Sequence, residues 1–358
     1  MNWTGSASAN ARRCRPPRSA RRDGGIGGTA GTRRDQNRTW PSRSAAGTRF
    51  ADLPPALVGK AKIHILDTIG AALAGTRSAE FRMVRSLLHA VPPREDGAIT
   101  GARVWGTPLL VSARDAALAN GVAAQAFELD DTGGCDHSGA VVVPAVLAAL
   151  AQAPQPVSGK ALIASVVVGY DVGRRVLEAA GGYDAHNGAG WHSTGTCGPI
   201  GAAAAIANLW GLSPQRCRSA IALATSTSAG LWAFIHDGSQ AKKIHAGRAA
   251  EGGLLAAALA AQGLSGPTRV FDDVWGGFFT SFNHQPGRGA DRRVGHGVEA
   301  GPGVAEALRV LPRHPFGGGL RRGHPGGNRP RRRQRRGRRG AAQPDADGEA
   351  GTGRSRSR

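Results

Sequence analysis

The chain has 358 residues, of which 41% are hydrophobic and only 5% aromatic, and its formal net charge is +21. This length allows a sizeable core, and the abundance of alanine, leucine and valine favours closely packed helices over sheets. No apolar stretch reaches the roughly 18 residues of a membrane span, and the N-terminus lacks the apolar core of a secretory signal, so neither a membrane protein nor a secreted one is expected.

The positive charge is confined to the two ends of the chain. Residues 1–50 carry 11 arginines against 2 aspartates and residues 283–358 carry 18 arginines against 6 acidic residues, whereas the remainder has 17 basic and 17 acidic residues. Both ends contain arginine without lysine, beside glycine, proline and alanine. GC-rich DNA yields this amino-acid composition when it is translated out of frame. We therefore interpret residues 1–49 and 283–358 as disordered tails that arise from a wrong frame or a misplaced start. An organelle transit peptide is the alternative for the N-terminal tail.

Helices are predicted through most of the middle, residues 50–282. Apolar residues recur every four positions from Leu53 to Leu73, between two prolines and Gly75, and Ser112 with Asp115 starts a second helix that reaches about Phe127. A weak strand is expected at 98–105. Further helices are expected at 80–90, 140–153, 159–180 after Ser158, 198–212, from Pro214 after Ser213, and at 249–263.

Three polar breaks separate these apolar segments and carry the residues suited to chemistry. The first, Glu128–Gly139, holds Glu128, Asp130, Asp131, Thr132, Cys135, Asp136 and His137; the second, 181–196, holds His186, His192, Ser193 and Thr194; the third, 236–248, holds Lys242, Lys243, His245 and Arg248. If the helices form one bundle, the breaks can converge at one end of it. Each group also has a structural interpretation: a loop histidine, a solvated lysine pair, or an Asp-Asp turn.

The third break suits a polyanionic small molecule, because it offers lysine and arginine charges beside glycine backbone amides. His137 and His192 are candidates for moving a proton at carbon next to a carboxylate, since imidazole titrates near neutral pH. A metal site from Glu128, Asp131, Cys135 and His137 fits no zinc spacing, so no metal is expected. The four cysteines, Cys14, Cys135, Cys197 and Cys217, form no framework and indicate a reduced cytoplasmic protein.

Five segments, in this order, together resemble the MmgE/PrpD family of lyases, which includes the 2-methylcitrate dehydratase and cis-aconitate decarboxylase types. They are I-L-D-T-I-G-A-A-L-A-G (65–75), A-L-A-N-G-V-A-A-Q-A-F-E-L-D-D-T (117–132), H-S-G-A-V-V-V-P-A (137–145), W-H-S-T-G-T-C-G-P-I-G-A-A-A-A (191–205) and D-G-S-Q-A-K-K-I-H-A-G-R-A-A (237–250). The resemblance implies a mainly α fold with a large helical domain, a homodimer, no cofactor, and dehydration or decarboxylation of a di- or tricarboxylate.

The resemblance also implies positions for the site. Catalytic residues would fall on Glu128, Thr132, His137, His192 and Lys242, with substrate bound nearby by Asp130, Asp131, Lys243, His245 and Arg248. Glu128 stands where relatives commonly have aspartate, and the loop from Thr132 to His137 is slightly short.

The family's smaller α/β lid domain has no counterpart in 283–358, where the Arg-rich tail stands instead. A product without the lid is expected to be poorly soluble and weakly active or inactive. A second interpretation, from a different class, is a non-catalytic nucleic-acid-binding protein that acts through the charge of its C-terminal tail. The middle domain is neutral and the tail lacks interleaved aromatic residues, so any such binding is expected to be non-specific.

Overall fold

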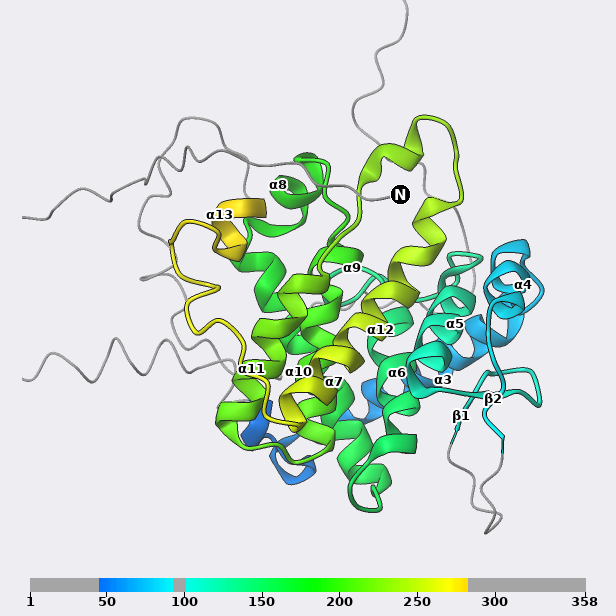
Figure 1. Cartoon of the computed structure of the whole chain (residues 1–358), viewed down its shortest axis with the longest axis horizontal. Helices are drawn as coiled ribbons and strands as arrows, with labels where there is room; N and C mark the ends of the chain where they lie inside the picture. Colours follow the sequence, from blue (N-terminus) through cyan, green and yellow to red (C-terminus); the bar gives the residue numbers. More distant parts are fainter. Residues whose placement is uncertain (1–44, 93–100, 283–358) are drawn as a thin grey trace, which may run out of the picture. The chain divides into compact units, whose positions relative to one another are not determined.

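The computed structural model describes residues 45–92 and 101–282 (Figure 1). Both Arg-rich tails beyond these limits, the proposed nucleic-acid contact and the first part of the predicted strand lie outside the described residues. The described chain reaches back further than the expected start at Phe50, because the Asn208 side chain donates hydrogen bonds to the carbonyls of Ala45 (2.6 Å) and Thr48 (3.0 Å). Within the described part, no helix combines the length and hydropathy that a membrane span requires.

Three of the predicted helix starts are confirmed at the level of single hydrogen bonds. The hydroxyls of Ser112, Ser158 and Ser213 each accept a hydrogen bond from the backbone three residues later, at 3.1, 3.2 and 3.4 Å. These caps begin α5 (Ala113–Gln125), α7 (Gly159–Ala179) and α11 (Pro214–Ala224). A serine that satisfies an otherwise unpaired amide is a local signal, which is why the sequence predicted it.

The fold is mainly α, as predicted. Helices α10 (Gly198–Leu209) and α12 (Ala241–Ala261) pack on each other, α7 packs on α10, and α5 packs on α12. Helix α6 (Ser138–Ala149) contacts all four of these helices. The remaining elements are η1 (Phe50–Asp52), α3 (Pro55–Gly75), α4 (Ala79–Ser86), η2 (Leu150–Gln152), α8 (Gly182–Gly188), α9 (Ser193–Thr196), η3 (Thr225–Thr227), η4 (Trp232–Ile235) and α13 (Phe278–Phe282).

Small residues bring the helix backbones into contact. A Cβ added to Gly121 of α5 would lie 2.7 Å from the Cα of Gly247 in α12, and one added to Gly201 of α10 would lie 2.6 Å from the carbonyl oxygen of Gly169 in α7. Real side chains do not fit at such distances, so these crossings require glycine. The alanine-rich core follows from the same close approach.

Three expectations differ from the structure. Of the part of the predicted strand that the structure describes, Ala102–Arg103 forms β1, paired antiparallel with β2 (Leu110–Val111). The second polar break contains the short helices α8 and α9. The third break is largely helical, since α12 begins at Ala241 rather than at Ala249. Its first turns have no apolar periodicity because their side chains meet the polar groups described next.

Candidate functional site

The stretch Glu128–Gly139 is held in a strained backbone conformation. In the described part of the chain, three residues other than glycine have positive φ: Glu128 (55°), Asp136 (74°) and His137 (38°). All three lie in this stretch. Such conformations cost about 1–3 kcal/mol each and persist where the surrounding structure enforces them, often at functional sites.

His137 begins α6 and shares a buried hydrogen bond with Asp130. Its Nδ1 lies 2.9 Å from Oδ2 of Asp130, and the side chains are 8% and 0% exposed. Burial acts to lower the pKa of His137, but the hydrogen bond and charge of Asp130 outweigh it, so the pKa is raised. Burial also raises the pKa of Asp130, whose second oxygen has no hydrogen-bond partner among the described residues. The pair therefore retains a proton to higher pH than free histidine does.

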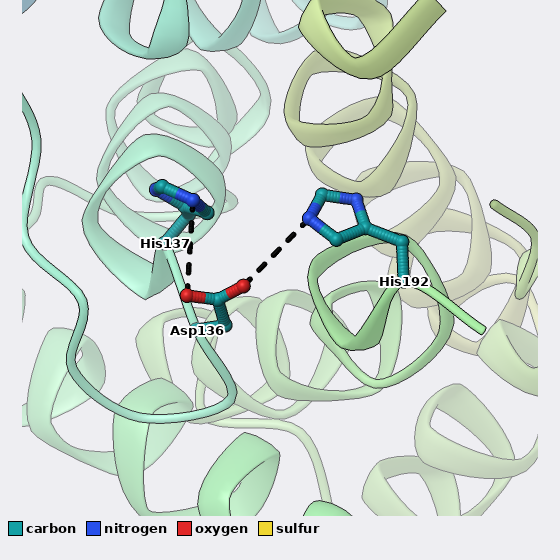
Figure 2. Close-up of side chains that lie close together, drawn as sticks. All are labelled: Asp136, His137 and His192. Carbon is teal, nitrogen blue, oxygen red and sulfur yellow. Dashed lines mark ion pairs between the residues drawn. The ribbon is translucent and has the colours of Figure 1, made fainter. Parts of the chain in front are cut away.

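His192 lies beside His137 and has the opposite character. It is fully buried at the start of α9, and burial lowers its pKa, so it is neutral at neutral pH. The carboxylate of Asp136 lies between the two rings (Figure 2): Oδ1 is 3.7 Å from Nε2 of His137, and Oδ2 is 3.7 Å from Nε2 of His192. On its other side His192 meets His245, with 2.9 Å between their Nδ1 atoms.

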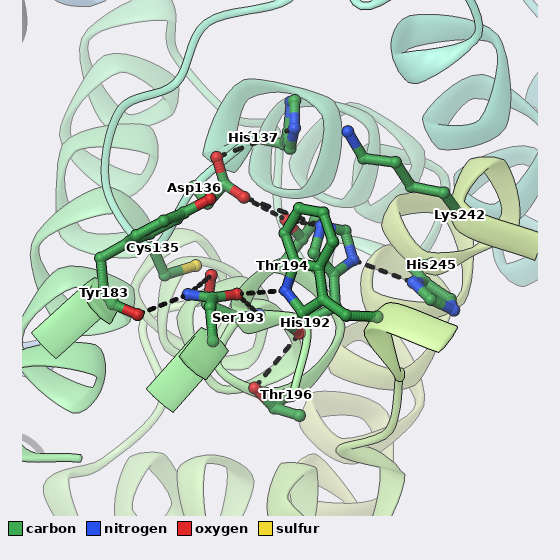
Figure 3. A network of polar contacts seen from close by, with 12 residues as sticks. Cys135, Asp136, His137, Tyr183, His192, Ser193, Thr194, Thr196, Lys242 and His245 are labelled. Atoms are coloured by element: carbon green, nitrogen blue, oxygen red, sulfur yellow. Dashed lines mark hydrogen bonds and ion pairs between the residues drawn. The ribbon is translucent and has the colours of Figure 1, made fainter. Parts of the chain in front are cut away.

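Two lysines from the first turn of α12 meet Glu128. Lys242 Nζ donates to Glu128 Oε2 at 2.6 Å, and Lys243 Nζ donates to the other oxygen of the same carboxylate. Burial opposes ionisation of Glu128, but these hydrogen bonds outweigh it and lower its pKa. Carboxylates after the C-terminal end of a helix face its negative pole, and the lysines supply the compensating charge. Figure 3 shows Lys242 on the same side of the network as His137 and His245.

Asp131 turns away from this cluster and anchors the loop to two helices. Its Oδ2 lies 2.8 Å from Nδ1 of His64 in α3 and accepts a 2.5 Å hydrogen bond from the hydroxyl of Tyr170 in α7. Oδ1 accepts from the Gly133 amide at 3.0 Å. Although burial acts to raise the pKa of Asp131, these partners lower it. Asp131 is thus a buried charge whose contacts fix the position of the strained loop.

The three polar breaks therefore meet, but not every candidate joins the cluster. Glu128, Asp130, His137, His192, Lys242, Lys243 and His245 come together. Arg248 instead pairs with Glu251, which also binds Arg114, and Thr132 is exposed. His186 contacts Thr196 at 2.7 Å, and burial lowers the pKa of His186 to about 4.

The sequence did not predict the central position of Asp136 between His137 and His192. Its position next to His137 in a glycine-containing loop was the available signal, but the sequence does not show that His192 reaches its other oxygen. Trp232 and Phe234 were also missed; their rings lie 5.1 and 5.8 Å from that of His192 and enclose it.

The cluster offers some atoms that a metal could bind. Ligand atoms of Asp136, His137 and His192 lie within 4.8 Å of one another. The positive charge of Lys242, which acts to lower the pKa of both histidines, also opposes a cation there. The four metal ligands considered from the sequence do not come together as a site. Asp131 faces His64, and the thiol of Cys135 lies 3.4 Å from the Ser138 hydroxyl. Burial also raises the pKa of Cys135 to about 12. We assign no metal to these residues.

Comparison with known proteins agrees with the resemblance seen in the sequence. The chain is 33% identical over 243 residues to cis-aconitate decarboxylase of Aspergillus terreus, covering 66% of this chain and 48% of that protein. It is 34% identical over 245 residues to the cis-aconitate decarboxylase-like protein oryM of Aspergillus oryzae (66% and 49%), and 32% identical over 245 residues to human cis-aconitate decarboxylase (66% and 49%).

The matched segment spans about half the length of these curated relatives. The pattern of the MmgE/PrpD N-terminal domain matches residues 42–288, which include all the described helices. The chain belongs to the MmgE/PrpD family, whose relatives here are lyases.

Proposed function

We propose that this chain forms the pocket of a lyase that removes carbon dioxide from a tricarboxylate of the cis-aconitate type. The observation that carries the proposal is the pair His137 and His192. Their rings are 6.2 Å apart, yet the pKa of His137 is raised and that of His192 is lowered. Where the pKa values of two neighbouring groups are driven apart, the roles of the groups differ: the group with the raised pKa keeps its proton and can act as the acid, and the group with the lowered pKa stays neutral.

The lysines supply the charge that would hold the substrate. Lys242 and Lys243 carry two positive charges, and among the described residues Glu128 is their acidic partner. A substrate carboxylate that approaches Nζ of Lys242 therefore meets a net attraction. Charge-assisted hydrogen bonds of this kind contribute about 1.5–3 kcal/mol each.

Protonated His137 is placed to complete the reaction. In the proposed step, the C–C bond to one carboxylate breaks, carbon dioxide leaves, and the electron pair is delocalised toward a remaining carboxylate. His137 then transfers the proton on Nε2 to carbon and is reprotonated from solvent. Its Nε2 is 3.6 Å from Glu128 and 3.7 Å from Asp136, beyond hydrogen-bonding distance, so this proton is not committed to either carboxylate.

The same argument favours decarboxylation over dehydration or epimerisation, which both begin with removal of a proton from carbon. That step needs a ring nitrogen with a free lone pair facing the substrate. A protonated His137 lacks one, and the two nitrogens of neutral His192 are engaged with His245 and Thr194. Decarboxylation needs only an acid and stabilisation of the developing negative charge. The decarboxylases among the relatives support this choice.

The test follows labelled carbon. The chain is incubated with uniformly ¹³C-labelled cis-aconitate in D₂O, and ¹³C NMR is expected to show labelled carbon dioxide or bicarbonate and one deuterium per product molecule. Lys242→Met is expected to abolish the signal, whereas Lys62→Met, an exposed lysine on α3, retains it. A hydrated or dehydrated product, or no labelled carbon dioxide from a folded chain even after long incubation, would overturn the proposal; the low activity and solubility expected without the lid stay predictions. The homodimer and the cytoplasmic location stay predictions.

A further inference from the structure

His245, which is partly buried, and His192, which is fully buried, form a ring pair that the proposed reaction does not explain. Their Nδ1 atoms are 2.9 Å apart, with ring centroids at 5.0 Å. Phe234 lies against both rings, at 5.8 Å from His192 and 6.0 Å from His245. Two bare nitrogens would repel at this distance, and so would two N–H groups. One ring must donate and the other must accept.

The direction of this hydrogen bond follows from the contacts of the other ring nitrogen of His192, Nε2. The Thr194 hydroxyl donates to Oδ2 of Asp136 at 3.4 Å. A hydroxyl has one hydrogen, so Thr194 must then accept from its other neighbour, Nε2 of His192, at 3.2 Å. Nε2 of His192 therefore carries a hydrogen.

Neutral His192 has no second hydrogen to give. Because burial lowers its pKa, it holds one ring proton near neutral pH, and that proton is on Nε2. Its Nδ1 is bare and accepts, so Nδ1 of His245 must donate. Burial, with the charge of Lys242, lowers the pKa of His245 to about 4, so His245 is neutral as well and is the Nδ1–H tautomer.

We propose that Thr194, whose hydrogen is committed to Asp136, is a positioning residue that fixes His192 as the Nε2–H tautomer, so that both nitrogens of His192 are engaged and His192 cannot act as a base. In the proposed function, His192 then stays a fixed neutral neighbour while His137 supplies the proton. The catalytic meaning rests on that function, whereas the tautomers are a property of the chain alone.

The backbone around Gly230 holds the two rings in this arrangement. The His192 amide donates to the carbonyl of Gly230 at 3.1 Å, and the Trp232 amide donates to that of Gly190 at 3.0 Å, around a bridge between Trp191 and Leu231. Gly230 has φ of 135°, and an added Cβ would lie 3.3 Å from Nδ1 of His245. A glycine is required where a ring packs this closely on a left-handed backbone.

The experiment reads the tautomers by long-range ¹H–¹⁵N NMR of the ¹⁵N-histidine-labelled chain, with His192→Gln and His245→Asn used for assignment. His192 is expected as Nε2–H and His245 as Nδ1–H. In Thr194→Ser the hydroxyl is retained, so His192 should stay Nε2–H; in Thr194→Val it should lose its fixed tautomer. His236→Asn, an exposed histidine, is the control and should change nothing.

Two outcomes overturn the inference: an Nδ1–H His192 in the unaltered chain, or an unchanged His192 spectrum in Thr194→Val. Turnover gives a separate readout. With cis-aconitate, Thr194→Val should lower kcat about 3- to 10-fold, the effect of one neutral hydrogen bond, with KM little changed, and Thr194→Ser should restore it. If the tautomers are as expected but the unaltered chain releases no carbon dioxide, the proposed function fails and the inference stands.

Discussion

Asp130→Asn tests whether a buried carboxylate keeps His137 protonated. The substitution preserves the shape and an acceptor for the 2.9 Å hydrogen bond but removes the negative charge. A hydrogen bond to a charged group contributes about 1.5–3 kcal/mol and a neutral one about 0.5–1.5. The difference, about 1–1.5 kcal/mol, corresponds to about one pKa unit. The loss of the wider Coulomb attraction adds to it, so we expect the pKa of His137 to fall by about one to two units.

The assay is an NMR titration of the histidine Cε1–H signals, assigned with His137→Gln. The folded-state pKa of His137 is raised above 6.5, so its contribution to stability is fully present below about pH 6.5 and is lost as pH rises through the raised value. In Asp130→Asn, this pH dependence should weaken. Asp171→Asn is the matched control, because it neutralises another buried carboxylate, paired with Arg175 at 2.8 Å, away from the histidines. An unchanged pKa of His137 in Asp130→Asn would refute the reasoning.

Further substitutions test other parts of the structure. Lys242→Met should weaken tricarboxylate binding about 10- to 100-fold, the worth of a charge-assisted hydrogen bond, measured by calorimetry against Lys62→Met; equal affinities would contradict the assigned role. Gly121→Ala should destabilise the fold by about 1–3 kcal/mol in chemical denaturation, because its Cβ meets the backbone of Gly247. Gly59→Ala, in open space on α3, should instead stabilise it by about 0.5–1 kcal/mol, and a similar sign for both would refute the packing argument. Tyr170→Phe should cost about 1–3 kcal/mol by leaving buried Asp131 with one partner fewer, and a neutral result would show that His64 and Gly133 suffice.

The helix starts were predictable because their causes are local. Ser112, Ser158 and Ser213 each satisfy an amide three residues away, and proline at the start and glycine at the end frame α3. The early start of α12 was not predictable in this way. Lys242, Lys243 and His245 break the apolar period, and only the presence of Glu128 and His192 across the cluster accounts for polar residues in a helix at this point.

The residues of the site were predictable by type, but their roles were not. The density of acids, histidines and lysines at the three breaks pointed to Asp130, His137, His192 and Lys242. The division between a raised pKa at His137 and a lowered one at His192 depends on which ring has a buried carboxylate at 2.9 Å and which does not. Spacing along the chain contains no such information. The different orientations of Asp130 and Asp131 were not predictable either. The two residues are adjacent in the sequence, but Asp130 contacts His137 and Asp131 contacts His64 and Tyr170.

The separation of the three breaks along the chain has a consequence for folding kinetics. Asp130 and His137, then His192, then Lys242 and His245, are about 50 residues apart in turn, and they meet only after α5, α6, α9 and α12 have packed. Contacts between such distant segments form slowly because each closes a long loop of chain. An intermediate that lacks α12 has neither lysine in place and lacks His245, the partner of Nδ1 of His192. Burial of His245 among its partners lowers its pKa to about 4, so the recovery of this lowered pKa during refolding would report the docking of α12, not the early collapse of the alanine-rich core.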